Sequence, residues 1–276
     1  FGMAQASVIT RTMRDTAVML EAISVPQTGD PFIIRQPQHP YRHYLRDPGP
    51  VRRIGVSVSP LMDAPVDPEV AATVMATARM LQQLGHHVEE AAPDFDLVEM
   101  DKMLTELWYF QFDRYLDWLG ERSGRKVGPD TVERASLAFY EFAKGRSVDA
   151  HLKALDDLNV FRRRIGKFYD HFDMWLTPTC AQVAQPNELY GMNVDVQASA
   201  FLQREQRPCQ FMVWVNVAGV PALSLPLGQH SSGLPIGVQL AARPGHEEQL
   251  IAIGAQLEHA MPWRDRLPPT HVSRIL

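Results

Sequence analysis

Cysteine is scarce in this sequence, since only Cys180 and Cys209 occur among its 276 residues. Two cysteines are too few for the disulfide framework of a small secreted domain, so we expect free thiols and a reducing, cytoplasmic location. No apolar run approaches the roughly 18 residues that cross a bilayer, and neither a transmembrane helix nor a signal peptide is expected within these residues. The chain begins with Phe1 and Gly2 inside a folded pattern, and we expect an N-terminal part of the protein to precede it.

An excess of positive charge is also lacking, because 27 lysines and arginines are outnumbered by 32 aspartates and glutamates. The formal net charge of −5 gives no electrostatic reason to bind nucleic acid or an anionic membrane surface. A hydrophobic content of 45% is typical of a globular protein, and the length suffices for one large core or two modest ones.

Motifs for metals and nucleotides are missing as well. The sequence contains no His-Glu-x-x-His, no cysteine and histidine set with zinc spacing, and no glycine-rich phosphate loop. His86 and His87 are adjacent, so on a strand they would point to opposite faces. We therefore expect neither a metal nor a cofactor.

What is present is the periodicity of an α/β fold. Residues 53–58 alternate as a strand, a helix capped by Asp67 and Pro68 follows until Gly85, and a second strand begins at Val88. This strand–helix–strand unit favours an α/β sheet. An earlier helix, expected over residues 12–22, begins with Thr12 and Asp15 in the spacing of a capping box.

Helical spacing then dominates as far as residue 172. We expect helices over residues 97–119, 129–144 and 148–171, a strand over 173–177, and after it a loop without a clear period. Two strands over residues 222–227 and 235–241 flank a polar turn, and a helix spans 247–261. The predicted organisation is a single domain over residues 1–276, with a helical cover over about 95–172 and a C-terminal sheet and helix over 173–276.

Two side-chain groups invite a catalytic interpretation. Ser231 and Ser232 precede Gly233 in the polar turn, where serine and glycine serve turn geometry, so we interpret them as structural. Cys180 follows a strand end, which is a favourable place for a functional side chain. No motif pairs it with His171 or His230, and a thiol that lines a pocket is the preferred interpretation.

The features described so far indicate only an α/β protein that resembles an enzyme. Further segments resemble one particular family. Residues 216–226, 233–240 and 243–250, followed by Pro262 and Trp263, resemble the C-terminal hallmark of the amidase signature family. Residues 10–17, 53–56, 84–90 and 173–179 resemble the family in the same order along the chain. The resemblance runs from about residue 8 to residue 269. Gly219 and Pro221 in the hallmark favour a tight turn before a strand, and Gly237 favours a close backbone approach.

The resemblance implies an amidase-signature fold, in which helices cover a mixed central sheet, here without its N-terminal part. It also implies hydrolysis of amide bonds through an acyl-enzyme, with a Ser–cis-Ser–Lys triad and no cofactor. That lysine and the Gly-Ser-rich segment precede the family's counterpart of the helix at Thr12. None of the five lysines here, Lys102, Lys126, Lys144, Lys153 and Lys167, matches the catalytic one. No catalytic residue is therefore assigned to this chain.

The implied partners are a small-molecule amide and the missing N-terminal part, with a homodimer left open. By analogy with the places where family members differ, we predict that Trp108, Thr179, Cys180 and Asn216 line the substrate pocket. The alternative functions are the glutaminase subunit of a tRNA-dependent amidotransferase and a non-catalytic, truncated amidase-like domain. Hydrolases of cyclic nylon dimers and aryl or fatty amidases are further relatives that the sequence does not rank.

Overall fold

A computed structural model describes residues 2–4 and 6–274. The helices and strands, in chain order, are α1 (Met13–Ile23), β1 (Arg53–Val56), α2 (Pro68–Gln83), β2 (His87–Glu90), α3 (Leu97–Trp108), α4 (Phe112–Ser123), α5 (Arg134–Lys144), α6 (Val148–Phe168), β3 (Met174–Pro178), α7 (Ala198–Gln206), α8 (Gln210–Ala218), β4 (Ala222–Gln229), β5 (Pro235–Ala242) and α9 (Glu247–Ala260). Short 3-10 turns lie at η1 (Tyr41–Leu45), η2 (Asn187–Tyr190) and η3 (Val272–Arg274). Among the described helices, none is long and apolar enough to cross a membrane.

The five strands form one mixed sheet in the order β2-β1-β3-β5-β4. β1 pairs in parallel with both β2 and β3, whereas β5 runs antiparallel to β3 and β4. The predicted α/β fold with a mixed central sheet is therefore confirmed, including the unit of β1, α2 and β2.

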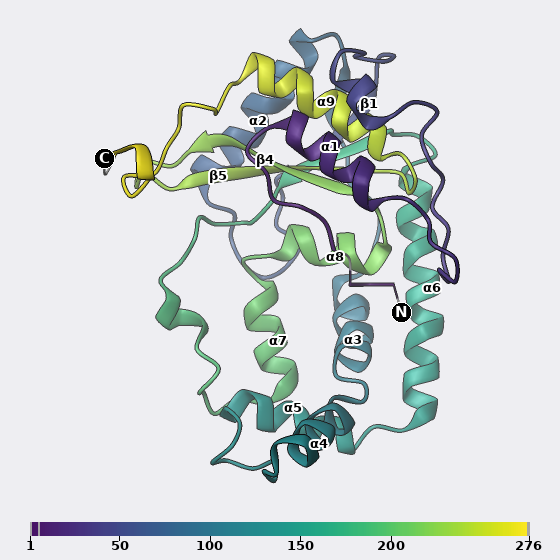
Figure 1. The fold of residues 1–276 in the computed structure, drawn as a ribbon, viewed down its shortest axis with the longest axis vertical. Helices are drawn as coiled ribbons and strands as arrows, with labels where there is room; N and C mark the ends of the chain where they lie inside the picture. Colours follow the sequence, from purple (N-terminus) through teal and green to yellow (C-terminus); the bar gives the residue numbers. More distant parts are fainter. Residues whose placement is uncertain (1, 5, 275–276) are drawn as a thin grey trace.

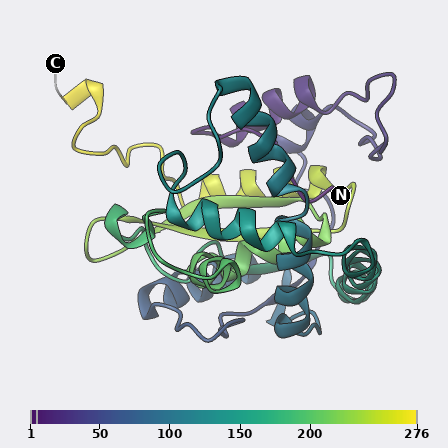
Figure 2. The same ribbon diagram turned by 90° about the horizontal axis from the view of Figure 1, so that it is seen from below.

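Successive residues of β3 enter two different cores, because side chains on a strand alternate between the faces of the sheet. Met174 and Leu176 pack with α1, α2 and α9 on one face. Trp175 packs on the other face with residues of α3, α6 and α8. Figure 1 shows α1 and α9 above the sheet and α8 below it, and Figure 2 shows the molecule from below, with the helical region towards the viewer.

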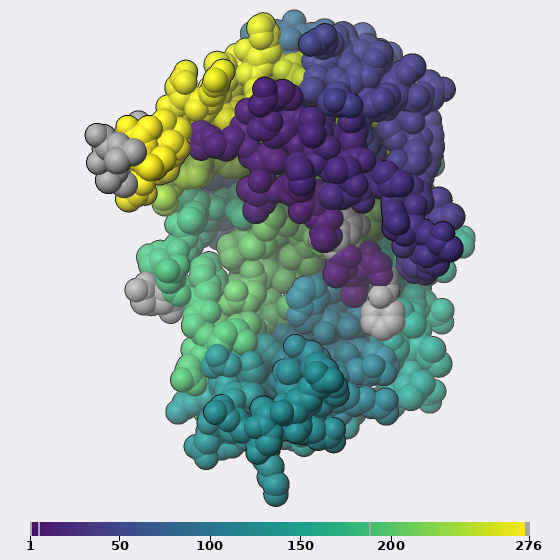
Figure 3. Space-filling view, in the orientation of Figure 1, coloured from purple at the N-terminus to yellow at the C-terminus, as the bar shows by residue number. Residues whose placement is uncertain are grey.

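Helices α3 to α7 extend away from the sheet and give the molecule its long axis. In Figure 1, α3, α6 and α7 run down from the sheet to α4 and α5 at the foot. The space-filling view shows the segments near the two ends of the chain side by side at the top, with the helical region below (Figure 3). Trp263 joins these two ends, since its indole N–H donates a hydrogen bond of 2.9 Å to the carbonyl of Arg11.

The helix caps predicted from the sequence are present. The hydroxyl of Thr12 accepts a hydrogen bond from the backbone N–H of Asp15 at the start of α1. Asp67 caps α2 in the same way and accepts from the N–H groups of Glu69 and Val70. Gly85, just after α2, has a φ of +95°, a conformation that glycine adopts without steric cost.

Two expectations about helices are wrong. The helix expected over residues 97–119 is two helices, because Gln111 adopts a left-handed φ of +61° between α3 and α4. The break allows Tyr109 to turn into the core, where its hydroxyl donates to the carbonyl of Ala198 at 3.3 Å. The loop expected after β3 contains α7 and α8, which the sequence analysis missed.

A prediction about pH follows from His86, which is buried between the strand and helix layers. Its Nδ1 accepts the backbone N–H of Arg52 at 3.2 Å, so Nε2 carries the proton that points to Oε1 of Gln256, also at 3.2 Å. Burial lowers the pKa of His86 below its usual range. As the pH falls below about 6.5, the unfolded chain binds a proton that the folded state binds only at lower pH. Stability is therefore expected to fall with acidification in that window.

The measurement is urea unfolding at pH 7.5 and 5.5 for the wild type and for His86→Gln. The variant is expected to lose less stability between the two pH values than the wild type. His87→Gln serves as the control, because His87 is the exposed neighbour on β2. If the stability of the wild type and of His86→Gln changes equally between the two pH values, His86 is not the group that causes the loss.

Candidate functional site

A cavity of about 350 Å³ lies where β3 ends and β5 begins. Its volume is in the range of small-molecule sites, and the carboxyl end of a strand is the usual place for a ligand in an α/β sheet. The lining is mainly apolar, and its one charged side chain among the described residues is Glu205. The residues that line it are Val70, Thr179, Cys180, Gln182, Val183, Ala184, Gln185, Tyr190, Glu205, Pro208, Cys209, Pro235, Ile236 and Gly237.

Thr179 is held in the cavity wall by both neighbouring strands. Its backbone N–H donates to the carbonyl of Gly237 at 3.0 Å, and its hydroxyl lies 2.6 Å from the hydroxyl of Ser224 on β4. A Cβ added at Gly237 would lie 2.9 Å from Oγ1 of Thr179. Gly237 does allow a close approach, but the groups that approach it are the side chains of Thr179 and Ser224.

The opposite wall is a chain excursion that leaves the sheet at Cys180 and comes back beside Cys180 at Cys209, just before α8. Where it leaves, the N–H of Ala181 donates to the carbonyl of Pro208 at 2.8 Å. The carbonyl of Ala181 accepts from the N–H of Asp67 at 2.8 Å, which ties the excursion to the start of α2. We call residues 180–209 the cavity excursion.

Both thiols of the molecule are free, and in this wall they lie close enough for each to shift the pKa of the other. The interaction with Cys209, followed by burial, raises the pKa of Cys180. The same contact lowers the pKa of Cys209. The cysteines are thus a pair, which the sequence spacing did not indicate.

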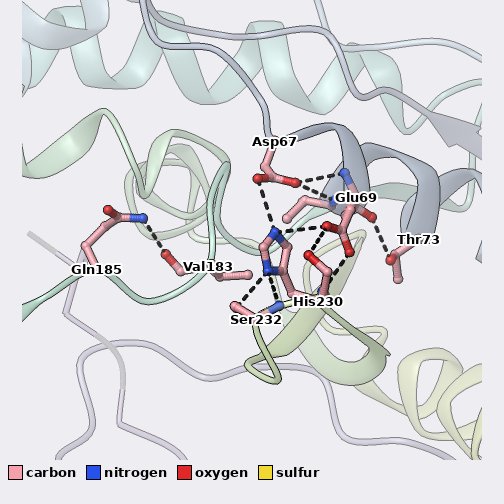
Figure 4. Close-up of polar contacts among 9 residues, drawn as sticks. Asp67, Glu69, Thr73, Val183, Gln185, His230 and Ser232 are labelled. Carbon is pink, nitrogen blue, oxygen red and sulfur yellow. Dashed lines mark hydrogen bonds and ion pairs between the residues drawn. The ribbon is translucent and has the colours of Figure 1, made fainter.

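A polar cluster at the rim joins the β4–β5 turn to the start of α2 (Figure 4). Nε2 of His230 lies 3.5 Å from Oδ2 of Asp67 and 3.3 Å from Oε1 of Glu69. The hydroxyl and the N–H of Ser231 donate to the carboxylate of Glu69 at 2.6 and 2.8 Å. These hydrogen bonds lower the pKa of the Glu69 carboxyl.

This cluster contains a serine, a histidine and a carboxylate, so its geometry tests the catalytic interpretation of the turn. Nδ1 of His230 lies 2.7 Å from the Ser232 hydroxyl and also accepts the N–H of Ser232 at 3.1 Å. A histidine that accepts the N–H two residues on is bound to its own turn. Ser232 is exposed and is not among the cavity's lining residues. Both serines lie in the turn between β4 and β5, as expected, and their purely structural role stays a prediction.

The structure brings two of the four predicted pocket residues together. Thr179 and Cys180 line the cavity. Trp108 is 59% exposed at the end of α3 that leads to α4, far along the helical region. Asn216 is exposed on α8, where its side-chain amide donates to the carbonyl of Met3 at 3.0 Å. Trp108 and Asn216 are therefore not among the residues that line this cavity, and contact with a substrate stays a prediction for all four.

The dependence of the cavity on Gly237 predicts the effect of a methyl group there. Gly237→Ala is expected to push Thr179 out of the wall and to destabilise the protein by about 1–3 kcal/mol, as overpacking does. Thermal unfolding measures the loss. Gly128→Ala is the matched control, since a Cβ there would meet nothing within 4 Å. Equal melting temperatures for the two variants would contradict the prediction.

With this geometry established, comparison with known proteins decides the family. A family model described as Amidase matches residues 1–251. The chain belongs to the amidase signature family. The resemblance noted in the sequence is thereby confirmed.

Curated relatives of this amidase-family chain extend well beyond it. The 6-aminohexanoate-cyclic-dimer hydrolase of Paenarthrobacter ureafaciens is 31% identical over 274 residues, which cover 97% of this chain and 56% of the relative. The enzyme of the same name from Pseudomonas sp. (strain NK87) is 32% identical over 275 residues, with the same coverage. The chain thus spans about half the length of the curated relatives it matches.

Solved structures agree with this fold. A structure of 6-aminohexanoate cyclic dimer hydrolase complexed with substrate matches with a TM-score of 0.85 and 32% identity, over 94% of this chain and 55% of that one. A bacterial aryl acylamidase matches with a TM-score of 0.75 and 21% identity, over 92% of this chain and 52% of that one. The second likeness concerns the fold alone.

Proposed function

We propose that this chain is the C-terminal portion of an amide hydrolase and forms the substrate-binding wall of its active site. The catalytic serines and lysine are supplied by a segment outside these 276 residues. The observation that carries the proposal is the match of nearly the whole chain to about half of a substrate-binding amide hydrolase. None of the five lysines lines the described cavity, which supports an external catalytic lysine.

The proposed chemistry divides the work between the two portions. In the other portion, a neutral lysine accepts a proton through a cis serine, and a second serine attacks the amide carbonyl to form an acyl-enzyme. Backbone N–H groups hold the oxyanion, and water then releases the acid. The cavity beside Thr179 and Cys180 orients the rest of the amide.

The edge of the sheet supports an association between the two portions. β4 is an outer strand of the described sheet, and Ala222 near its start is exposed. An outer strand presents unpaired N–H and C=O groups that accept a further strand. We propose that the N-terminal portion completes the sheet at this edge.

The chemistry of the cavity favours an uncharged substrate with methylene chains, such as a small linear or cyclic amide. Val70, Val183 and Ile236 provide an apolar surface, and Glu205 is the charged side chain of the lining. A substrate with a free carboxylate, such as glutamine, would be repelled by Glu205. No arginine occurs among the described lining residues to bind such a carboxylate, which argues against the glutaminase alternative.

The test is hydrolysis of three substrates with and without the N-terminal portion: 6-aminohexanoate cyclic dimer, an anilide and glutamine. We expect no hydrolysis by the chain alone. With the N-terminal portion added, we expect the cyclic dimer or the anilide to be hydrolysed on the order of 10⁶-fold faster than without enzyme.

Three outcomes would contradict the proposal. Hydrolysis by the chain alone, with a fluorophosphonate label attached to one of its serines, would place the nucleophile here. If the complemented protein hydrolyses none of the three, the non-catalytic alternative is favoured. Hydrolysis of glutamine alone, dependent on a partner protein, would instead support the amidotransferase subunit.

A further inference from the structure

The two cysteines stand at the neck of the cavity excursion, one where the chain leaves and one where it returns. Cys180 follows β3 and Cys209 precedes α8. The neck is closed by the hydrogen bond from the N–H of Ala181 to the carbonyl of Pro208, at 2.8 Å. This bond joins the residue next to one cysteine to the residue next to the other. The backbone therefore holds the two side chains beside each other.

The thiols meet within the cavity wall. Both cysteines line the same cavity, and both are partly exposed. A disulfide requires a bond length of about 2 Å and Cα atoms no more than about 7 Å apart. The hydrogen bond between Ala181 and Pro208 brings together the peptide group that follows Cys180 and the one that precedes Cys209, which favours such a separation. A small oxidant can also reach them through the cavity.

The positions of the two sulfurs give them different reactivity. Cys209 occupies the N-cap of α8, where free N–H groups and the helix dipole stabilise a thiolate. The interaction with Cys180 lowers the pKa of Cys209, whereas the charge of Glu205 opposes that effect. The interaction with Cys209, followed by burial, raises the pKa of Cys180. The place of Cys209 at the helix N-terminus therefore makes it the attacking sulfur and Cys180 the resolving one.

We propose that Cys180 and Cys209 form a reversible intramolecular disulfide when the protein reacts with a hydroperoxide. The thiolate of Cys209 attacks one peroxide oxygen, the O–O bond breaks, and a sulfenic acid forms while hydroxide leaves. Cys180 gives its proton to that hydroxide and attacks the sulfenic sulfur. The S–S bond forms, the S–O bond breaks, and the second hydroxide leaves as water after taking a proton from solvent. The thiols lose two electrons and hydrogen peroxide is reduced to water.

The disulfide would lock the cavity excursion at its neck, with η2 and α7 inside the closed loop. It would also place the S–S bond in the wall beside Thr179. The proposal concerns the thiols alone, so it does not depend on amide hydrolysis by the protein.

The experiment treats the folded 276-residue chain with hydrogen peroxide and measures its intact mass without reductant. We expect a loss of about 2 Da, a fall in free thiols from two to none, and one cross-linked peptide that joins Cys180 to Cys209. Dithiothreitol should restore both thiols and the original mass.

Single variants test the order of the steps. Cys180→Ser is expected to stop at a sulfenic acid on Cys209, a gain of about 16 Da that dimedone traps. Cys209→Ser is expected to react at least 10-fold more slowly at the same peroxide dose. Circular dichroism and melting in dithiothreitol verify that both variants fold as the wild type does.

Three results would overturn the proposal. The first is a wild type that keeps both thiols at a dose that oxidises Cys180→Ser. The second is over-oxidation of one cysteine without the cross-linked peptide. The third is a disulfide between two copies of the chain, seen as a dimer on a non-reducing gel.

Discussion

Replacing Trp175 with alanine is expected to lower the free energy of unfolding by about 3–5 kcal/mol, the cost of deleting a large buried aromatic ring. The side chain is fully buried on β3, the central strand of the sheet. Its ring centroid lies 4.7 Å from that of Trp214 on α8 and 6.0 Å from that of Phe168 on α6. It is therefore one of the contacts that join the sheet to the helical region.

Urea unfolding followed by circular dichroism measures this loss. Trp108→Ala is the matched control, because that tryptophan is 59% exposed and its removal leaves no cavity. We expect the control to change stability by less than about 1 kcal/mol. If both tryptophan variants lose the same stability, the packing of Trp175 between the sheet and the helices does not contribute as expected.

Adding one methyl group at Gly55 is expected to be the second large effect on stability. A Cβ at this position would lie 2.7 Å from Cζ of Phe168 and 3.2 Å from the carbonyl oxygen of Ala91. Strand β1 is paired on both edges, and Phe168 is packed in the core. Neither the strand nor the phenyl ring can therefore move away easily. Gly55→Ala should cost about 1–3 kcal/mol through overpacking.

The same substitution at Gly166 should have the opposite sign. Gly166 lies inside α6, and a Cβ there would meet nothing within 4 Å. Alanine loses less backbone entropy than glycine in a helix, so Gly166→Ala should raise stability by about 0.5–1 kcal/mol. Thermal and urea unfolding of the two variants provide the comparison. A stabilising Gly55→Ala would show that the strand and helix are not in close contact.

Much of the fold could be predicted because its signals are local. Thr12 and Asp67 cap their helices through hydrogen bonds that span only three residues or fewer. Alternating apolar residues marked β1, because neighbouring side chains on a strand point to opposite faces of the sheet. The family resemblance came from residues with such local roles, including Gly219, which ends α8 with a φ of +71°.

The candidate site was predicted only in part. Thr179 and Cys180 were predicted by analogy with the family, Cys180 also from its position after a strand end, and both line the cavity. Trp108 and Asn216 were placed by analogy, and they lie elsewhere because helix direction and the break at Gln111 depend on long-range packing. Tyr190 and Glu205 were missed, since nothing in the aperiodic stretch after β3 indicates which residues turn toward the sheet.

The sequence by itself determined the α/β class, the helix caps and the family. Each of these features follows from the types of residues and from spacings of a few positions along the chain. Only the tertiary structure decided that Cys180 meets Cys209, that Gly237 makes room for Thr179, and that α7 and α8 follow β3. Those contacts join residues far apart along the chain. Their geometry depends on how the whole sheet and its helices pack together, and a short sequence pattern does not specify that packing.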